Sequence, residues 1–152
     1  MMQLTRAGEY GVRAVIYLAA QPEGKIIFVG EISESQDIPK SFASKILQIL
    51  VKSSLVRSQR GVKGGFMLAK PASQITLRDV IEVVEGPIFL NQCLIKKGEC
   101  PRDDFCPVHP VWREAQDKLM EILGGATIAG LVENGKALEK RMGKQALRKK
   151  KP

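Results

Sequence analysis

The spacing of apolar positions predicts three helices in the first third of the chain. Apolar residues recur at helical intervals between 7 and 20, and the breakers at 21–24 end that helix. A shorter helix is expected over 29–36. A third begins near Ser41 and runs for about 12 residues. Its apolar side is expected to comprise Phe42, Ile46, Ile49 and Leu50.

Two short strands follow, over 55–58 and 66–69, with a glycine-rich segment between them. Three of the five residues at 61–65 are glycine. Glycine adopts positive φ without a steric penalty, so this segment predicts a tight β-hairpin. The hairpin tip carries Arg60 and Lys63 and is therefore basic.

The second half predicts further helices around an irregular segment. Thr76 can cap a helix through Val84, and 88–109 reads as a loop that contains all three cysteines and the single histidine. A longer helix is expected over about 107–123, and a short helical piece over 127–132. The apolar side of the longer helix is expected to comprise Val111, Ala115, Leu119, Ile122 and Leu123. The fold class is mainly α with a small β-hairpin.

Composition and charge narrow the possible classes of protein. The chain has 152 residues and a net charge of +8, the size of one domain with an appendage. No apolar run reaches the ~20 residues of a membrane span, and no signal sequence is visible, so a cytoplasmic protein is expected. Residues 40–70 carry seven basic and no acidic side chains. Residues 136–152 carry eight basic and one acidic, and we expect a solvated, disordered tail there.

Three helices followed by a basic hairpin is the order of a winged helix-turn-helix. In that arrangement the third helix enters the major groove and the wing contacts the backbone or the minor groove. The absence of acidic residues fits a surface that faces a polyanion. The candidate DNA-binding residues are Lys40, Ser41, Ser44, Lys45, Gln48, Arg60 and Lys63.

The sequence favours DNA binding over a protein-interaction module and over an enzyme. A protein-interaction module would require the same charges only to solvate an exposed surface. An enzyme is not expected, because the sequence shows no nucleophile–base pair and no phosphate loop.

The cysteines and the histidine form one candidate metal site with the pattern Cys93-x6-Cys100-x5-Cys106-x2-His109. Thiolate and imidazole ligands suit zinc or an iron–sulfur cluster. Structural zinc sites usually begin with a tight C-x2–4-C pair, which this loop lacks, and wider spacing suits a two-iron cluster. Zinc, a metal-free thiol switch and unliganded cysteines remain alternatives at this point.

Several of these segments together resemble the Rrf2 family of bacterial winged helix-turn-helix transcriptional regulators (IscR/NsrR-like). The resemblance covers about residues 1–135. The matching segments are Leu4-Thr5 with Glu9-Tyr10, Ile38-Pro39-Lys40-Ser41-Phe42, Arg60-Gly61-Val62-Lys63-Gly64-Gly65-Phe66-Met67-Leu68, Ile75-Thr76-Leu77-Arg78-Asp79-Val80-Ile81, and the cysteine loop with Val111-Trp112.

The resemblance implies a homodimeric regulator, most often a repressor, that binds a pseudo-palindromic operator. It also implies a 2Fe–2S cluster, with 4Fe–4S as an alternative, that senses iron–sulfur status, redox state or nitric oxide. Cys93, Cys100 and Cys106 would be thiolate ligands and His109 the imidazole ligand. The partner subunit's Glu9 is the alternative fourth ligand.

This sequence departs from the family pattern at two places. Six residues, where the family commonly has five, separate Cys93 from Cys100. Ser44 and Lys45 replace a Glu-Gln pair, so an operator sequence does not carry over. The expected organisation is a DNA-binding domain over 1–86, a cluster loop over 87–110, a dimerisation region over 107–135 and the tail over 136–152.

Overall fold

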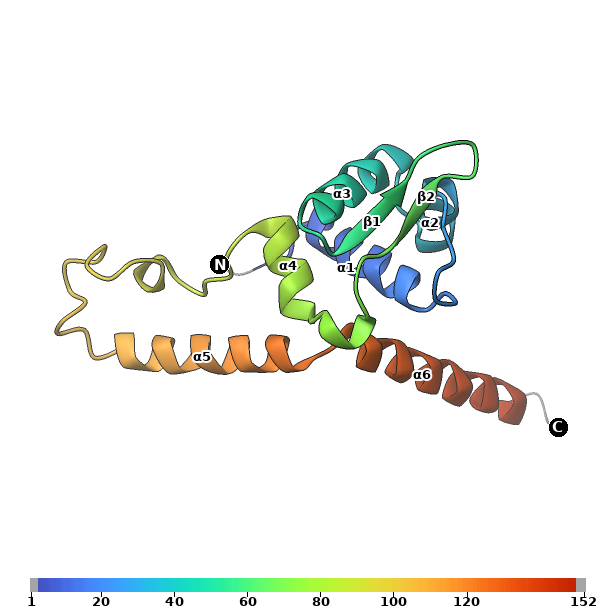
Figure 1. Cartoon of the computed structure of the whole chain (residues 1–152). Helices are drawn as coiled ribbons and strands as arrows, with labels where there is room; N and C mark the ends of the chain where they lie inside the picture. The colour runs from blue at the N-terminus through green and yellow to red at the C-terminus, as the bar shows by residue number, and fades with distance from the viewer. Residues whose placement is uncertain (1–2, 150–152) are drawn as a thin grey trace.

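A computed structural model describes residues 3–149 of the chain, with side chains through 144, and it confirms the mainly helical class with one hairpin. Figure 1 shows a compact head from which a long helix and a loop project. The elements are α1 (Arg6–Ala19), α2 (Val29–Gln36), α3 (Lys40–Lys52), β1 (Val56–Gln59), β2 (Gly65–Leu68), α4 (Leu77–Glu85), α5 (His109–Gly125) and α6 (Ile128–Lys149), with short 3-10 turns at Ala72–Gln74 and Gln92–Leu94.

The core lies where α1, α3 and α4 meet. Ala14, Val15 and Leu18 are the most buried apolar side chains of α1. The start of α1 is tied to the end of α4, because the Glu85 carboxylate accepts hydrogen bonds from both the backbone N–H and the hydroxyl of Thr5, each at 2.6 Å. The two termini of these helices are therefore fixed against each other.

The buried side of α3 differs from the predicted one. Its core residues are Ala43, Ile46, Leu47 and Leu50. Phe42 and Ile49 are 43% and 38% exposed, so their assignment to the core was wrong. The spacing 43, 46, 47, 50 also forms a helical stripe, and it is this stripe that packs against α1 and α2. Phe42 instead contacts the edge of the Tyr10 ring, at 5.8 Å between centroids.

The hairpin is antiparallel and pairs Val56 with Leu68 through Gln59 with Gly65. Gly61 has φ +111°, which favours glycine at the tip. At Gly65, a Cβ would lie 2.5 Å from the carbonyl oxygen of Ile27. That close approach allows Ile27 and Phe66 to exchange backbone hydrogen bonds of 2.9 and 2.8 Å, which fasten the wing to the segment before α2.

α4 begins with a capping box and is followed by the cysteine loop. The Thr76 hydroxyl accepts from the Asp79 N–H at 3.1 Å, and the Asp79 carboxylate accepts from the Thr76 N–H at 2.9 Å. After α5 the chain is pinned to the head, because the Ile128 N–H donates to Ile75 and the Leu77 N–H donates to Ala126, both at 2.8 Å. None of the helices in the described part of the chain has the length and apolar character of a membrane span.

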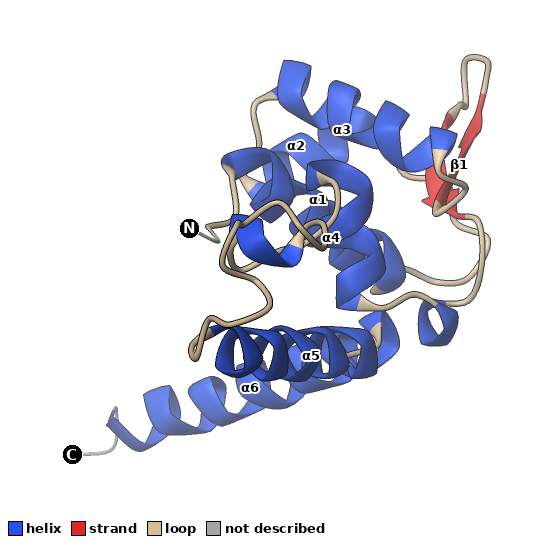
Figure 2. Cartoon of the chain, turned by 90° about the vertical axis from the view of Figure 1, so that its left-hand side faces the viewer, coloured by secondary structure: helices blue, strands red, loops and turns tan. Residues whose placement is uncertain are grey.

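The segment after residue 127 differs most from expectation. α6 extends to Lys149, so two predictions were wrong as far as that residue: a short helix over 127–132 and a disordered tail over 136–152. Residues 150–152 lie outside the described part of the chain. Alanine, leucine, glutamate and lysine are strong helix formers and are frequent here, which accounts for the longer helix. In Figures 1 and 2, α3 and the wing lie on one side of the head and α6 on the other, with α1 and α4 between them.

Candidate nucleic-acid interface and cysteine loop

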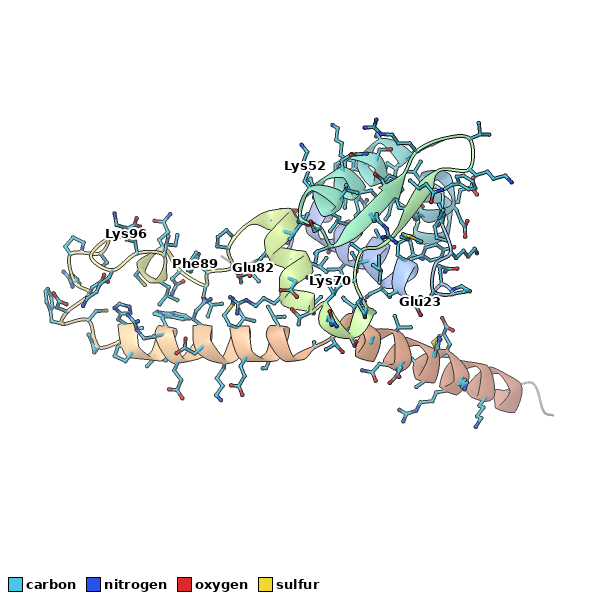
Figure 3. The ribbon with its side chains drawn as sticks, viewed as in Figure 1. Glu23, Lys52, Lys70, Glu82, Phe89 and Lys96 are labelled. Carbon is cyan, nitrogen blue, oxygen red and sulfur yellow. The ribbon has the colours of Figure 1, made fainter. Side chains whose placement is uncertain are left out.

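The outward side of α3 is polar and basic. Since the core stripe occupies 43, 46, 47 and 50, positions 41, 45, 48 and 52 point to solvent. Ser41, Lys45, Gln48 and Lys52 are exposed there, and Ser44 is half-buried. Lys52 is labelled in Figure 3 on the outer side of α3. A shallow groove along the helix is lined by Ser44, Lys45, Gln48, Ile49 and Lys52.

The first turn of α3 has no side-chain cap. The residue before the helix is Pro39, and no side chain accepts from the first N–H groups. Uncapped N–H groups at a helix start are donors for an anion such as a phosphate. Lys40 and Ser41 lie in this first turn and are exposed.

The wing presents its cations freely. Arg60 and Lys63 are exposed in the turn between β1 and β2, on either side of Val62, which is fully exposed. No cation between 40 and 70 forms an ion pair with a carboxylate of the described side chains. The structure therefore brings the predicted DNA-binding residues of α3 and the wing to one side of the head. Sequence reasoning missed Ile49 on this surface, because it placed Ile49 in the core.

The cysteines lie in the loop at the far end of α5, at the left of Figure 1. Cys93, Cys100 and Cys106 are all free and half-buried. Within the described residues, no three Cys, His, Asp or Glu side chains are gathered in positions that could hold one metal ion. The four predicted ligands therefore share a loop but are not assembled into one site.

His109 is the best-defined residue of this loop. It is buried at the first position of α5, with Nδ1 3.4 Å from the Asp103 carbonyl oxygen and 3.5 Å from its carboxylate, and Nε2 3.3 Å from an Arg113 nitrogen. Asp103 also accepts a hydrogen bond from the Gly98 N–H at 2.8 Å. A carboxylate on one ring nitrogen orients the imidazole and leaves the other nitrogen for a ligand, the usual outer-sphere pattern of metal-binding histidines. An open hollow of about 520 Å³ lies beside His109 and Cys106.

Two side chains of α5 hold the base of the loop. Gln116 donates to the Ile88 carbonyl at 2.7 Å and accepts from the Leu90 N–H at 2.9 Å. One turn earlier, the Trp112 N–H lies 3.3 Å from the Asn91 amide oxygen in the amide orientation that satisfies both groups. This clamp cannot be recognised from the sequence, because the partners of Gln116 are backbone groups more than 20 residues away in the chain.

Another side of α5, together with Val108 just before it, carries an apolar stripe whose outermost side chains are exposed. Val108, Val111 and Ile122 are 48%, 62% and 68% exposed. Ala115 and Leu119 lie between them at helical spacing. Of the predicted stripe, Val111 and Ile122 are exposed, whereas Ala115, Leu119 and Leu123 are half-buried. Glu9, the alternative ligand, is exposed in the first turn of α1.

A basic recognition surface built from a third helix and a wing defines a winged-helix DNA-binding protein. The sequence matches the family model described as "Rrf2: Iron-dependent Transcriptional regulator" over residues 4–134. The chain belongs to the Rrf2 family of transcriptional regulators.

Characterised relatives and solved structures agree with this assignment. The chain is 36% identical over 138 residues to the HTH-type transcriptional regulators IscR of Cronobacter sakazakii and Escherichia coli, covering 91% of this chain and 85% of each relative. It is also similar to the cysteine regulator CymR of B. subtilis, with a TM-score of 0.73 and 25% identity over 88% of this chain and 98% of CymR. The T. potens IscR structure gives a TM-score of 0.71 and 25% identity, covering 88% of both chains. These relatives are regulators and not enzymes.

Proposed function

We propose that the protein is a homodimeric repressor whose operator binding is modulated by an iron–sulfur cluster in the cysteine loop. The observation that carries the DNA-binding part is the set of unpaired cations on α3 and the wing, on one side of the head. Relatives named IscR support the regulatory class.

On DNA, the two parts of the basic surface have different tasks. The uncapped start of α3 and Lys40 would hold a backbone phosphate and so fix the register of the helix. Ser44, Lys45 and Gln48 would face base edges, and Ile49 can contact a thymine methyl group. Arg60 and Lys63 would bind the backbone beside the wing.

The apolar stripe of α5 supports a dimer. Monomeric proteins rarely expose a regular apolar helix side, and a second copy of the same stripe covers it in a self-complementary way. A dimer of this kind would place two α3 helices for a pseudo-palindromic operator.

The donor set of the loop fits an iron–sulfur cluster by its chemistry. Three free thiols and an imidazole already oriented by Asp103 are the ligand types of a two-iron cluster, and Arg113 offsets the charge of nearby thiolates. Cys93, Cys100, Cys106 and His109 would hold the group, with the partner's Glu9 in place of His109 as the alternative. When bound, the cluster supplies a redox-active centre that can also be lost.

Assembly of the cluster would require the side chains around His109 to rearrange. Arg113 must leave Nε2, while Asp103 keeps its place on Nδ1. The loop must also close around the thiols, and this motion reaches α5 through Gln116 and Trp112. A zinc site or a metal-free thiol switch would use the same residues.

Anaerobic purification tests the cluster. The expected result is a coloured protein with iron and sulfide in equal amounts, and a colourless protein with stoichiometric zinc contradicts it. His109→Ala is expected to change the visible spectrum, and His109→Cys, which restores a ligand, to recover cluster content. If neither His109→Ala nor Glu9→Ala changes the spectrum, both fourth-ligand assignments are wrong.

DNA recognition is tested with duplexes selected by this protein from fragmented genomic DNA. Arg60→Ala is expected to weaken binding and to lower the slope of log affinity against log salt by about 1, with the melting temperature unchanged. Lys118→Ala, an exposed cation of α5, is the matched control and should bind as the parent does. If Arg60→Ala binds DNA as tightly as the parent protein does, the wing is not part of the DNA interface.

A further inference from the structure

The outer half of α6 is a second basic surface, separate from α3 and the wing. Lys136, Lys140, Arg141 and Lys144 are all exposed, and none forms an ion pair with a carboxylate of the described side chains. These residues lie beyond the stretch matched by the family model, which ends at residue 134. The surface is therefore a feature of this chain that the family assignment does not explain.

The cations occupy one side of the helix. Lys136, Lys140 and Lys144 are spaced four residues apart, so they follow one another at intervals of about 6 Å along the axis. The apolar residues Leu131, Leu138 and Met142 lie on the other side, in line with Ile128, which is fully buried against the head. The contact with the head at Ile128 and Leu131 thus turns the basic side outward.

The position of α6 excludes a role in the α3 interface of the same head. Figures 1 and 2 agree that α1 and α4 separate α6 from α3 and the wing. A duplex lying against α3 is therefore on the other side of the head from Lys136–Lys144.

We propose that the outer half of α6 binds the phosphate backbone of a second DNA segment, so that the protein bridges two duplexes. A duplex carries one negative charge per about 1.7 Å, so a row of cations finds phosphates in any sequence. Arg148, Lys149, Lys150 and Lys151 follow in the sequence, beyond the described side chains, and are also basic. A membrane surface is a poorer partner, because α6 contains no aromatic residue and, among its described side chains, exposes only Leu138 and Met142 as large apolar groups.

The inference goes beyond operator binding, and a sandwich assay tests it. One duplex, selected by the protein itself, is immobilised; the protein is added; and capture of a labelled random duplex of about 30 base pairs, roughly three helical turns, is measured. The test variant combines Lys136→Gln, Lys140→Gln, Arg141→Gln and Lys144→Gln. The control combines Leu138→Gln and Met142→Gln, which alters the apolar side of the same helix and keeps every charge.

The expected result is that the test variant binds the first duplex as the parent does and loses capture of the second. The control keeps both. The four replaced cations should contribute about 3.6 to the slope of log capture against log salt, at about 0.9 per phosphate contact.

Three outcomes overturn the proposal. If the test variant still captures the second duplex, the cations of α6 do not bind it. If the control variant loses capture to the same extent, the second duplex is held by an apolar contact instead. Loss of the first duplex in the test variant places α6 on the operator. If selection with the parent protein yields no duplex that it binds, operator binding itself is contradicted, so the two failures are distinguishable.

Discussion

Replacing Ile122 by glutamine tests the dimer through the apolar stripe of α5. Ile122 is 68% exposed and contacts no core, so the change should alter the stability of the isolated fold by less than about 0.5 kcal/mol. In a dimer the same side chain is buried by the second copy. The variant therefore separates association from folding.

The size of the effect follows from the exposed fraction. Complete burial of an isoleucine side chain is worth about 1.5–3 kcal/mol, and two thirds of that surface remains to be covered, which gives about 1–2 kcal/mol per copy. A self-complementary interface contains both copies, so the loss is about 2–4 kcal/mol per dimer. This corresponds to a dissociation constant raised about 30-fold to 700-fold.

Sedimentation equilibrium at several protein concentrations measures this constant directly. Met142→Gln is the control, because Met142 is 71% exposed on α6 and the chemical change is similar. We expect the control to dimerise like the parent. The reasoning is refuted if Ile122→Gln dimerises as tightly as the parent, or if the parent is a monomer at micromolar concentration.

Three further changes probe the head and the loop. Thr76→Ala removes the capping box of α4 and should lower the free energy of unfolding by about 1 kcal/mol in urea titrations, while Thr76→Ser should retain it. The hydrogen bond to Glu31 raises the pKa of Tyr17 above 10.0, so its stabilisation is complete below pH 10 and is lost as pH rises through the folded pKa. Tyr17→Phe should therefore cost about 1 kcal/mol at pH 7 and progressively less above pH 10. Gln116→Leu should speed amide exchange at Leu90 by about tenfold or more, and unchanged exchange would contradict the clamp.

The sequence predicted the secondary structure of the head because its signals are local. Helical spacing, the glycines of the wing and Thr76 as a cap each act within a few residues. The errors came from packing between distant parts. Positions 42, 46, 49 and 50 and positions 43, 46, 47 and 50 are both helical stripes, and only contact with the neighbouring helices decides between them.

The candidate site was predictable in composition and not in geometry. Thiol and imidazole side chains within one loop can be recognised from spacing, yet the pairing of His109 with Asp103 and Arg113 depends on how the loop meets α5. The like charges of the segment after residue 135 do not prevent a helix as far as Lys149. Residues of high helix propensity continue α6 without needing a buried face.

If the cysteine loop regulates operator binding as proposed, the coupling free energy between the two sites can be compared with the energy of the contacts that would transmit it. α5 holds the base of the loop through Gln116, presents Ile122 to the partner and packs against α4, which in turn packs against α1 and α3. Coupling between sites is typically 1–3 kcal/mol. The two hydrogen bonds of Gln116, at about 0.5–1.5 kcal/mol each, amount to the same range. Breaking this one clamp when the loop rearranges would therefore suffice to change operator affinity by the factor of about 5–150 that such coupling represents.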